Sequence, residues 1–236
     1  MTVLSLASRT TKPKVEPRSP SGLSYAEAWT LIGGLSNPSK MPWYSWSISA
    51  FDCNTGGKLR EVKGSICEKC YATRGFYQMP NVKAALDRRM IGLKDPQFVD
   101  AFVFVLSTLY ERQRGPKENR FRWHDSGDLQ DAEHLTRINE IAKATPFLVH
   151  YLPTKELKLV KEWMKTNKPE PNLFIKISNP MIGQRFKTSP VEGASFSTAG
   201  VDNDPTLVQC PAGSQGNKCL SCRMCWTSSN INYHVH

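Results

Sequence analysis

The apolar positions of the chain follow two alternating periods, and these predict alternating strands and helices. Five short runs are rich in apolar, aromatic and β-branched residues, as buried strands are: residues 43–49, 120–124, 147–152, 172–178 and 194–197. Elsewhere apolar positions recur every three or four residues, as they do in helices packed on one side: residues 24–35, 67–76, 81–93, 96–114, 130–144 and 154–166. The chain is therefore predicted to belong to the α/β class.

The order of these elements predicts how the strands are arranged. Strand–helix–strand units of this length imply parallel strands joined by right-handed crossovers. About five or six such strands would form a partial (β/α) barrel, a thinner relative of the eight-stranded barrel. We therefore expect three regions: a flexible basic arm at residues 1–22, the partial barrel at residues 23–200 and a cysteine-rich, irregular C-terminal segment at residues 201–236.

Composition narrows the environment in which the chain works. A hydrophobic fraction of 39% and a charged fraction of 22% are ordinary for a globular protein. The most apolar stretch, residues 98–109, is too short to cross a membrane, and residues 1–20 lack the apolar core of a signal peptide. We therefore expect a cytoplasmic protein that does not bind a membrane.

The charge balance favours an anionic partner. The chain has 31 Lys and Arg residues against 21 Asp and Glu residues, which gives a net charge of +10. A surplus of this size is typical of proteins that bind nucleic acid or nucleotides, and a surface of solvated lysines is the simpler alternative. Four basic residues lie among prolines and serines near the start of the chain, and they favour a flexible basic arm: Arg9, Lys12, Lys14 and Arg18.

Seven cysteines fall into two groups with a long gap between them. The front thiols are Cys53, Cys67 and Cys70, and the back thiols are Cys210, Cys219, Cys222 and Cys225. Cysteines spaced two residues apart suit a metal, because one tight loop then directs several sulfurs to one centre. An odd number of cysteines and a reducing cytosol argue against a framework of disulfides.

The division into three and four thiols predicts two kinds of centre. Three thiolates on a cubic [4Fe-4S] cluster leave one iron open to a small molecule, whereas four thiolates close the cluster off. The back thiols resemble a ferredoxin run, because a cysteine followed by Pro211 accompanies three cysteines at two-residue intervals. Zinc is the alternative metal at the back thiols, since Cys-x2-Cys pairs also bind zinc. We expect one or two [4Fe-4S] clusters.

Polar side chains stand at the ends of four predicted strands. The front thiols follow the first strand, and the sequence His-Asp-Ser-Gly-Asp at residues 124–128 follows the second. Lys155 and Glu156 come after the third strand, and Ser178 and Asn179 end the fourth. Because parallel α/β folds bind ligands at the carboxyl ends of their strands, these groups would converge on one polar ligand.

A three-cysteine loop ending Cys-x2-Cys-Tyr-Ala after the first strand, with Trp-His-Asp-Ser-Gly-Asp after the second, resembles the radical S-adenosylmethionine proteins. More closely, residues 42–226 look like phage-encoded members or relatives, including the mycobacteriophage gene-product-eighty-eight family. The sequence departs from the superfamily in the longer gap between Cys53 and Cys67 and in Lys69, which replaces an aromatic residue. A phage-encoded protein would work in the cytosol of the host cell.

The resemblance implies a set of site residues. The front thiols would be the catalytic ligands of an open [4Fe-4S] cluster, and the back thiols would hold a second, auxiliary cluster. Ser126, Gly127 and Asp128 would bind the methionine part of S-adenosylmethionine. Three further strand-end residues are candidates for contacts with its carboxylate or ribose: Lys155, Ser178 and Asn179.

Simple structural roles are the alternative for several of these positions. Asp125 or Asp128 can cap the helix that follows, because both precede it by a few residues. His124 at a strand end can be a hydrogen-bonded core residue. Trp46 and Trp123 favour the core over contacts with a cofactor.

Two classes of function fit these patterns. In the first, the protein is an enzyme whose open cluster cleaves S-adenosylmethionine and modifies a substrate such as a nucleic acid, with electrons from a separate donor. In the second, it is a non-catalytic iron–sulfur or zinc module that binds nucleic acid or a host protein.

Overall fold

The computed structural model describes residues 18–235, which form one α/β unit around a single sheet. Residues 1–17 of the predicted basic arm lie outside the described residues. The rest of the arm packs against the body of the molecule, since the Ser21 N–H donates a hydrogen bond of 3.1 Å to the Asp100 carboxylate. Within residues 18–235 no helix combines the length and the apolarity that a membrane crossing requires.

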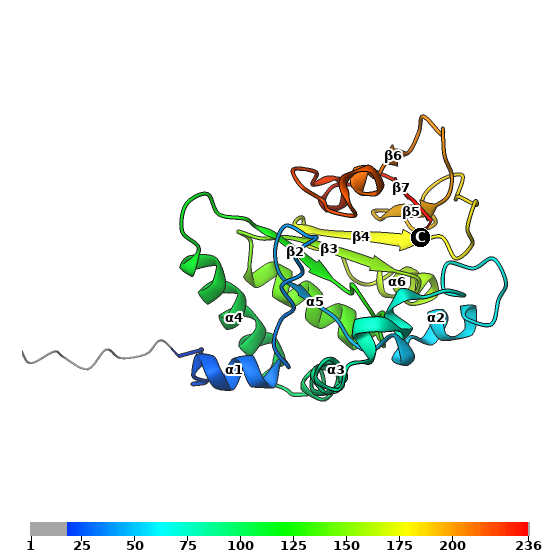
Figure 1. Cartoon of the computed structure of the whole chain (residues 1–236). Helices are drawn as coiled ribbons and strands as arrows, with labels where there is room; N and C mark the ends of the chain where they lie inside the picture. The colour runs from blue at the N-terminus through cyan, green and yellow to red at the C-terminus, as the bar shows by residue number, and fades with distance from the viewer. Residues whose placement is uncertain (1–17, 236) are drawn as a thin grey trace, which may run out of the picture.

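Seven parallel strands form the sheet, in the order β1-β2-β3-β4-β5-β7-β6 (Figure 1). Their bounds are β1 Ser45–Trp46, β2 Arg120–Trp123, β3 Val149–Thr154, β4 Leu173–Ser178, β5 Ser195–Ala199, β6 Val208–Gln209 and β7 Ile231–Tyr233. The predicted parallel pairing is confirmed at every neighbouring pair. Because β1 and β6 are the two ends of this order, the sheet is open, and the expected partial barrel is not confirmed.

Six α-helices occur among the described residues. They are α1 Tyr25–Leu31, α2 Asn54–Leu59, α3 Pro80–Gly92, α4 Phe98–Arg112, α5 Ala132–Ala144 and α6 Leu157–Trp163. All but α2 match predicted helices. The helix expected to begin in residues 67–76 is instead a pair of 3₁₀ turns, η2 Tyr71–Thr73 and η3 Gly75–Gln78, because Gly75 adopts a φ of 58° that a helix cannot contain.

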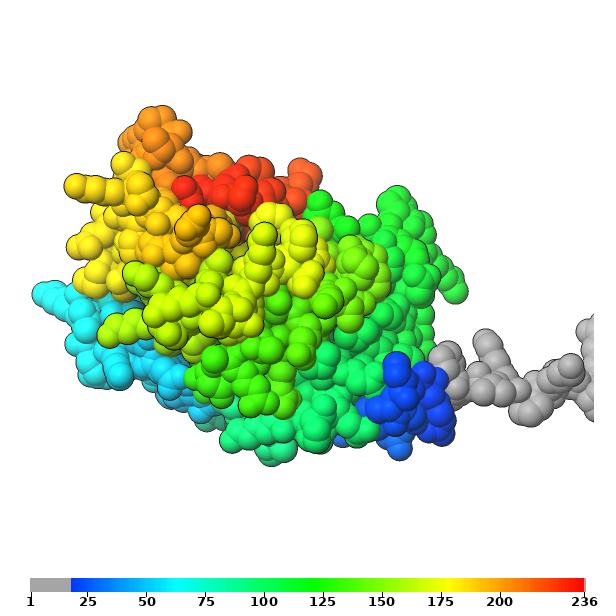
Figure 2. Space-filling model, turned by 180° about the vertical axis from the view of Figure 1, so that it is seen from behind, coloured from blue at the N-terminus to red at the C-terminus, as the bar shows by residue number. Residues whose placement is uncertain are grey.

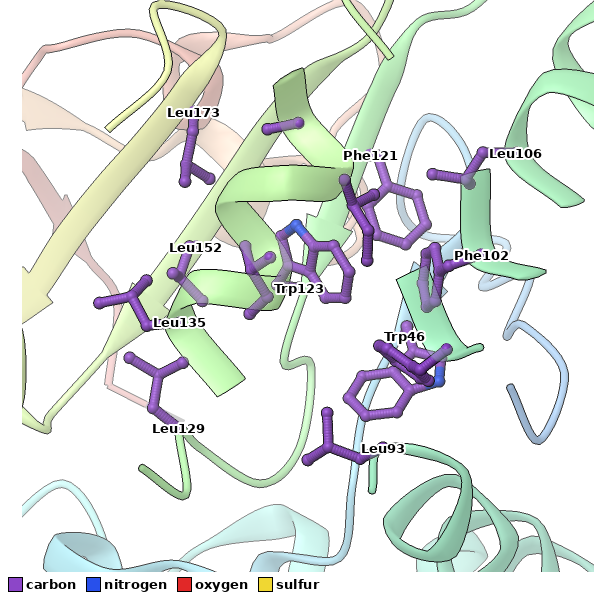
Figure 3. Close-up of a cluster of buried hydrophobic side chains, with 14 of the residues drawn as sticks. Trp46, Leu93, Phe102, Leu106, Phe121, Trp123, Leu129, Leu135, Leu152 and Leu173 are labelled. Carbon is purple, nitrogen blue, oxygen red and sulfur yellow. The ribbon is translucent and has the colours of Figure 1, made fainter. Parts of the chain in front are cut away.

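One face of the sheet is covered by helices and holds the apolar core (Figure 3). Trp46, Phe121 and Trp123 project from β1 and β2 towards Phe98 and Phe102 of α4, and the rings of Trp123 and Phe102 stack with centroids 4.9 Å apart. Burying a large apolar side chain of this kind contributes about 1.5–3 kcal/mol. The expected core role of the two tryptophans is confirmed. We call this side the helix face.

The opposite face is polar and lies beneath the C-terminal segment. Because side chains alternate along a strand, Arg122, Tyr151 and Lys176 project away from the helices. The Tyr151 ring packs on Trp226 at 5.6 Å, and Lys176 Nζ donates a hydrogen bond of 2.7 Å to the Thr227 carbonyl. Figure 1 shows the orange and red segment across the sheet from α3 and α4, and Figure 2 shows it from behind, far from the blue α1. We call this side the polar face.

The C-terminal segment contains two strands that the sequence did not predict. Residues beyond 200 were expected to be irregular, yet β6 and β7 join the edge of the sheet. Each strand has only two or three residues, too few for a period of two to be recognised. Between them the chain is irregular apart from two 3₁₀ turns, η4 Pro211–Gln215 and η5 Met224–Trp226.

Candidate functional site

The loop that carries the front thiols crosses the carboxyl ends of the central strands. Cys53 follows β1 and directly precedes α2. The Thr55 N–H and Oγ1 each donate a hydrogen bond of 2.7 Å to the Glu156 carboxylate after β3. The Ile66 N–H donates to the Pro180 carbonyl after β4 over 2.9 Å. The front thiols therefore lie where the polar strand ends meet.

Two of the front thiols face each other across Gly56. A Cβ atom at this position would lie 3.5 Å from the sulfurs of both Cys53 and Cys67, so these sulfurs are separated by no more than twice that distance. Burial raises the pKa of the Cys53 thiol to about 12, and the nearby Asp128, Cys67 and Cys70 add to this effect. Because Gly56 has no side chain, the space between the two sulfurs stays clear.

The spacing of these sulfurs bears on the kind of metal that they can bind. Among residues 18–235, no three or more Cys, His, Asp or Glu side chains are grouped closely enough for a single ion. A tetrahedral zinc site needs sulfurs about 3.8 Å apart, given Zn–S bonds of about 2.3 Å. A cubic cluster binds each thiolate through a different iron and accepts more widely spaced sulfurs. The separation across Gly56 is within reach of such a cluster.

The back thiols are gathered by the C-terminal segment over the polar face. Cys210 follows β6 and is tied to β7 by a backbone hydrogen bond of 2.9 Å. The Cys219 N–H donates to the Lys40 carbonyl over 2.9 Å, which joins the segment to the opposite edge of the sheet. Cys225 Sγ lies 3.2 Å from the Tyr233 hydroxyl, and burial raises the pKa of this thiol to about 11. The seven cysteines are free and half-buried.

Arg122 of β2 lies within electrostatic reach of Tyr71, which follows Cys70, and of three back thiols. The Arg122 Nη1 is 3.2 Å from the Met41 sulfur, which is a weak acceptor, and its shielded Nε has no hydrogen-bond partner among the described residues. Burial opposes the charge of Arg122, but Tyr71, Tyr151 and Asp125 nearby hold its pKa above the usual value. Shielded polar atoms are normally paired. The Nε of Arg120, on the same face of β2, has no hydrogen-bond partner among the described residues either.

The expected Ser-Gly-Asp motif forms a tight turn against the end of β1. The Ser126 hydroxyl donates a hydrogen bond of 2.8 Å to the Ile48 carbonyl. Gly127 has a φ of 74°, and a Cβ atom there would lie 2.3 Å from the Ile48 Cγ1. Only glycine fits this turn, because any other residue would meet both backbone strain and a steric overlap. Ser126 and Gly127 thus hold two strand ends together.

Asp128 is buried and accepts three hydrogen bonds. They come from Thr154 Oγ1 at 2.5 Å, the Lys155 N–H at 2.8 Å and the Leu129 N–H at 2.8 Å. Burial nevertheless raises the pKa of Asp128 to about 6. Lys155 Nζ forms no ion pair within residues 18–235. Both side chains lie within electrostatic reach of Cys53 and Cys67.

Ser178 and Asn179 join the ends of β4 and β5. The Ser197 hydroxyl donates to the Ser178 hydroxyl over 3.2 Å, and the Asn179 N–H donates to the Ser197 carbonyl over 2.8 Å. The Asn179 Oδ1 accepts a hydrogen bond of 3.0 Å from the Met181 N–H. Because the loop of the front thiols pairs with Met181 through a β-bridge from Ser65, both residues lie beside that loop.

The alternative structural roles can be compared with the geometry. Asp131 caps α5 by accepting a hydrogen bond of 2.8 Å from the His134 N–H, so the alternative in which Asp125 or Asp128 caps this helix is wrong. His124 is buried, as expected of a core residue, but neither of its ring nitrogens has a hydrogen-bond partner in the described part of the chain. Its ring meets the ring of His134 at 5.1 Å.

Sequence reasoning did not single out Arg122 or the anchoring role of Glu156. The signal for Arg122 was present in the sequence Arg-Phe-Arg-Trp of residues 120–123, where a period of two puts both arginines on one face of a strand. Glu156 had no such signal, because its partner Thr55 is 101 positions away in the chain.

Comparison with known proteins shows which family the chain resembles. A family model described as Gene product 88 matches residues 7–228, which is most of the chain. No curated protein and no solved structure is similar enough to match. The phage-type gene-product part of the expected resemblance is confirmed, and the radical S-adenosylmethionine part stays a prediction. The chain belongs to the Gene product 88 family.

Proposed function

We propose that this chain is an iron–sulfur protein with an open cluster site at the front thiols and a closed one at the back thiols. The observation that carries the proposal is that seven free, half-buried thiols fall into two groups, the front thiols at the strand ends and the back thiols over the polar face. Thiolates are the ligands that iron–sulfur clusters require. A cationic neighbour favours the thiolate form that binds metal.

The front site is the proposed centre of chemistry. Cys53, Cys67 and Cys70 would hold a [4Fe-4S] cluster, and three thiolates would leave it open to S-adenosylmethionine. When bound, the reduced cluster supplies the single electron that cleaves the sulfonium bond. Lys155 Nζ, which forms no ion pair within residues 18–235, would meet the ligand's carboxylate, and the Asp128 carboxylate would accept from its ammonium.

The other residues of the strand ends orient the ligand and exclude water. Ser126 and Gly127 fix the turn that carries Asp128, and Ser178 and Asn179 border the same loop beyond β4. Around them the net charge of +10 favours a nucleic acid or nucleotide as substrate. An electron donor in the host cytosol completes the reaction.

The second candidate is a non-catalytic module that binds nucleic acid or a host protein. The back thiols favour it, because four thiolates leave no open position on a cluster or a zinc ion. In this case salt-sensitive binding to RNA or DNA would survive the substitution Asp128→Asn.

Anaerobic reconstitution tests the proposal. About eight irons and matching sulfide per chain, with conversion of S-adenosylmethionine to 5′-deoxyadenosine under strong reductant, are the expected results. Cys70→Ser should abolish turnover and retain the iron of the back site, whereas Cys222→Ser should lose iron from the back site alone. Zinc or cystines in place of iron would contradict the proposal. Two intact clusters without turnover would leave the non-catalytic candidate.

A further inference from the structure

The exposed apolar side chains of the molecule gather around the front thiols. Nine large apolar side chains are exposed within residues 18–235, and five of them lie in residues 51–79, which we call the front loop: Phe51, Val62, Tyr71, Phe76 and Met79. A sixth, Ile182, is joined to the front loop, because its N–H donates a hydrogen bond of 3.0 Å to the Gly64 carbonyl. Such a concentration of exposed apolar groups is typical of a binding surface.

The front loop also carries the exposed aromatic rings. Among the Phe, Tyr and Trp side chains of the described residues, three are exposed: Phe51 at 54%, Tyr71 at 52% and Phe76 at 77%. The Arg60 guanidinium lies 5.1 Å from the centre of the Phe51 ring and donates a hydrogen bond of 2.9 Å to the Ala50 carbonyl. The Tyr71 hydroxyl donates to the Asp125 carbonyl at the end of β2. Rings that are held in place and face solvent suit stacking against flat ligands such as nucleobases.

Cations are interleaved with these rings. The front loop has five Lys and Arg residues against three Asp and Glu residues, and none of the eight forms an ion pair among the described residues. The five cations are Lys58, Arg60, Lys63, Lys69 and Arg74. Because the chain's own carboxylates do not neutralise them, they are available to phosphate groups. Aromatic rings among such cations are the combination by which proteins bind single-stranded nucleic acid.

A cavity of about 250 Å³ lies beside Phe51. The rings of Phe51 and Tyr77 form part of its wall, and three charged side chains also line it: Asp52, Lys83 and Asp87. None of these three forms an ion pair in the part of the chain that the structure describes. Pockets for drug-sized ligands usually have about 300–1,000 Å³, so this cavity suits a single ring system. Carboxylates accept hydrogen bonds from the amino groups of bases, so the lining favours a base that carries one.

We propose that the front loop binds a single-stranded nucleic acid, with bases stacked on Phe51 and Phe76 and an amino-bearing base in the cavity. This inference rests on the proposed function, because it names the substrate class of the front site. A duplex does not fit, since its bases already stack on one another and their faces are not accessible to the rings. Asp52 of the cavity directly precedes Cys53, so the bound base would lie beside the front thiols.

Binding of a fluorescently labelled DNA strand and of its duplex to the full chain, measured by anisotropy, tests the inference. We expect the single strand to bind more tightly than the duplex. Phe51→Ala and Phe76→Ala should each weaken binding of the strand about 10-fold, the typical loss of one stacked base. Phe51→Tyr should keep most of the affinity and Phe51→Leu should not. Leu220→Ala, at an exposed apolar position outside the front loop, is the control and should leave the affinity unchanged.

Two further substitutions test the phosphate contacts and the cavity. Arg74→Gln should reduce the slope of log affinity against log salt by about 0.7, the value for one phosphate contact on a single strand. Lys168→Gln is its matched control, because Lys168 is exposed before the amino end of β4, and it should leave the slope unchanged. A strand of cytosines should bind more tightly than a strand of thymines, which lack the amino group, and Asp87→Asn should reduce this preference.

Iron content and turnover of S-adenosylmethionine without nucleic acid are measured on the same samples, so the two proposals can fail separately. Equal affinity for strand and duplex, or unchanged affinity in both alanine variants, would overturn the inference, and turnover would then leave the proposed function standing. Equal affinity for cytosines and thymines would exclude a base from the cavity and overturn the inference as stated. Self-association that the alanine variants abolish, without binding of nucleic acid, would assign the surface to a second copy. Tight binding of the strand by a chain without iron would support the inference and contradict the proposed function.

Discussion

On the helix face of the sheet, Trp46, Phe102 and Trp123 pack edge to face or stack in an apolar core. On the polar face, Arg122 and Lys176 lie beneath a segment with little regular structure, which carries the back thiols. Parallel sheets usually have helices on both faces. Here one of the two helical layers is replaced by a thiol-bearing loop.

This difference shows where stability and chemistry reside. Apolar burial stabilises the helix face without any ligand, because it removes aromatic surface from water. The polar face has charged and hydrogen-bonding groups in its centre, and its cover makes few regular backbone hydrogen bonds. Binding of a metal couples directly to folding when the ligands come from such a segment. We therefore expect the two faces to respond differently to substitution and to metal removal.

The largest loss of stability should follow from a cavity in the helix face. Phe102→Ala removes a ring that contacts Trp46 and Trp123, and we expect the free energy of unfolding to fall by about 3–5 kcal/mol. Urea denaturation measures this change. Leu220→Ala, at a 60% exposed position in the C-terminal segment, is the control and should stay within about 0.5 kcal/mol. Equal effects of the two substitutions would contradict the comparison.

The next largest effect should come from the turn at the end of β2. In Gly127→Ala the alanine must adopt a φ of 74°, and its Cβ atom would lie 2.3 Å from Ile48. Backbone strain alone costs about 1–3 kcal/mol, so the free energy of unfolding should fall by more than this amount. Gly115→Ala is the matched control, because Gly115 has a similar φ of 76° with open space around it. The account requires Gly127→Ala to be clearly the more harmful of the two.

The helix face should also weaken in acid. His150 accepts a hydrogen bond from Trp123 and shares another with Thr145, and burial lowers its pKa to about 3. In the unfolded chain the pKa of a histidine is about 6.5, so below that pH the unfolded state binds a proton that the folded state excludes. The contribution of His150 to the free energy of unfolding should therefore fall as the pH drops from 7 towards 4, by up to about 1.4 kcal/mol per pH unit. His124 and His134, whose pKa values burial also lowers, should add to the decline.

Urea denaturation at a series of pH values measures this slope. His150→Gln should make the decline shallower, although it lowers stability at pH 7. His234→Gln, at an exposed position, should leave the slope unchanged. If the stability of the His150→Gln variant declined with pH as steeply as that of the unchanged chain, the role given to His150 would be contradicted.

A substitution beside the front thiols should have the smallest effect on stability and a clear effect on metal content. Gly56→Ala puts a methyl group 3.5 Å from the sulfurs of Cys53 and Cys67, where a cluster would lie. It lies in α2, where alanine favours the helix, but its Cβ atom would lie 3.1 Å from the Cys53 Cβ, so we expect only a small change in the stability of the metal-free chain. Iron at the front site should be lost. Gly57→Ala is the control, since the nearest atom there is the end of the Arg60 side chain at 3.6 Å, and it should bind iron normally.

Much of the fold could be predicted because it depends on local periodicity. The strands at residues 120–124 and 172–178 and the helix α4 have enough residues for their apolar pattern to be recognised. The short strands depend on tertiary pairing, β7 with β5 and β6 with β7, and α2 contains two glycines, so none of the three had a local signal. These elements are held by tertiary contacts.

The candidate site shows the same division. The grouping of the cysteines and the polar strand ends could be predicted, because the spacing of residues and the order of parallel strands are properties of the sequence. The hydrogen bonds that Asp128 accepts from Thr154 and Lys155 could not be predicted, because they depend on the register between strands. The position of Arg122 beneath the back thiols depends on how the C-terminal segment returns over the sheet.

Hydrogen–deuterium exchange of the metal-free and the reconstituted chain tests the central claim most directly, with iron measured on the same samples. The account predicts that iron slows exchange in the cover of the polar face, residues 208–233, and leaves α4 and α5 unchanged. Two results would contradict it: equal exchange rates in the two samples although iron is bound, or slow exchange of residues 208–233 in a sample that contains no metal.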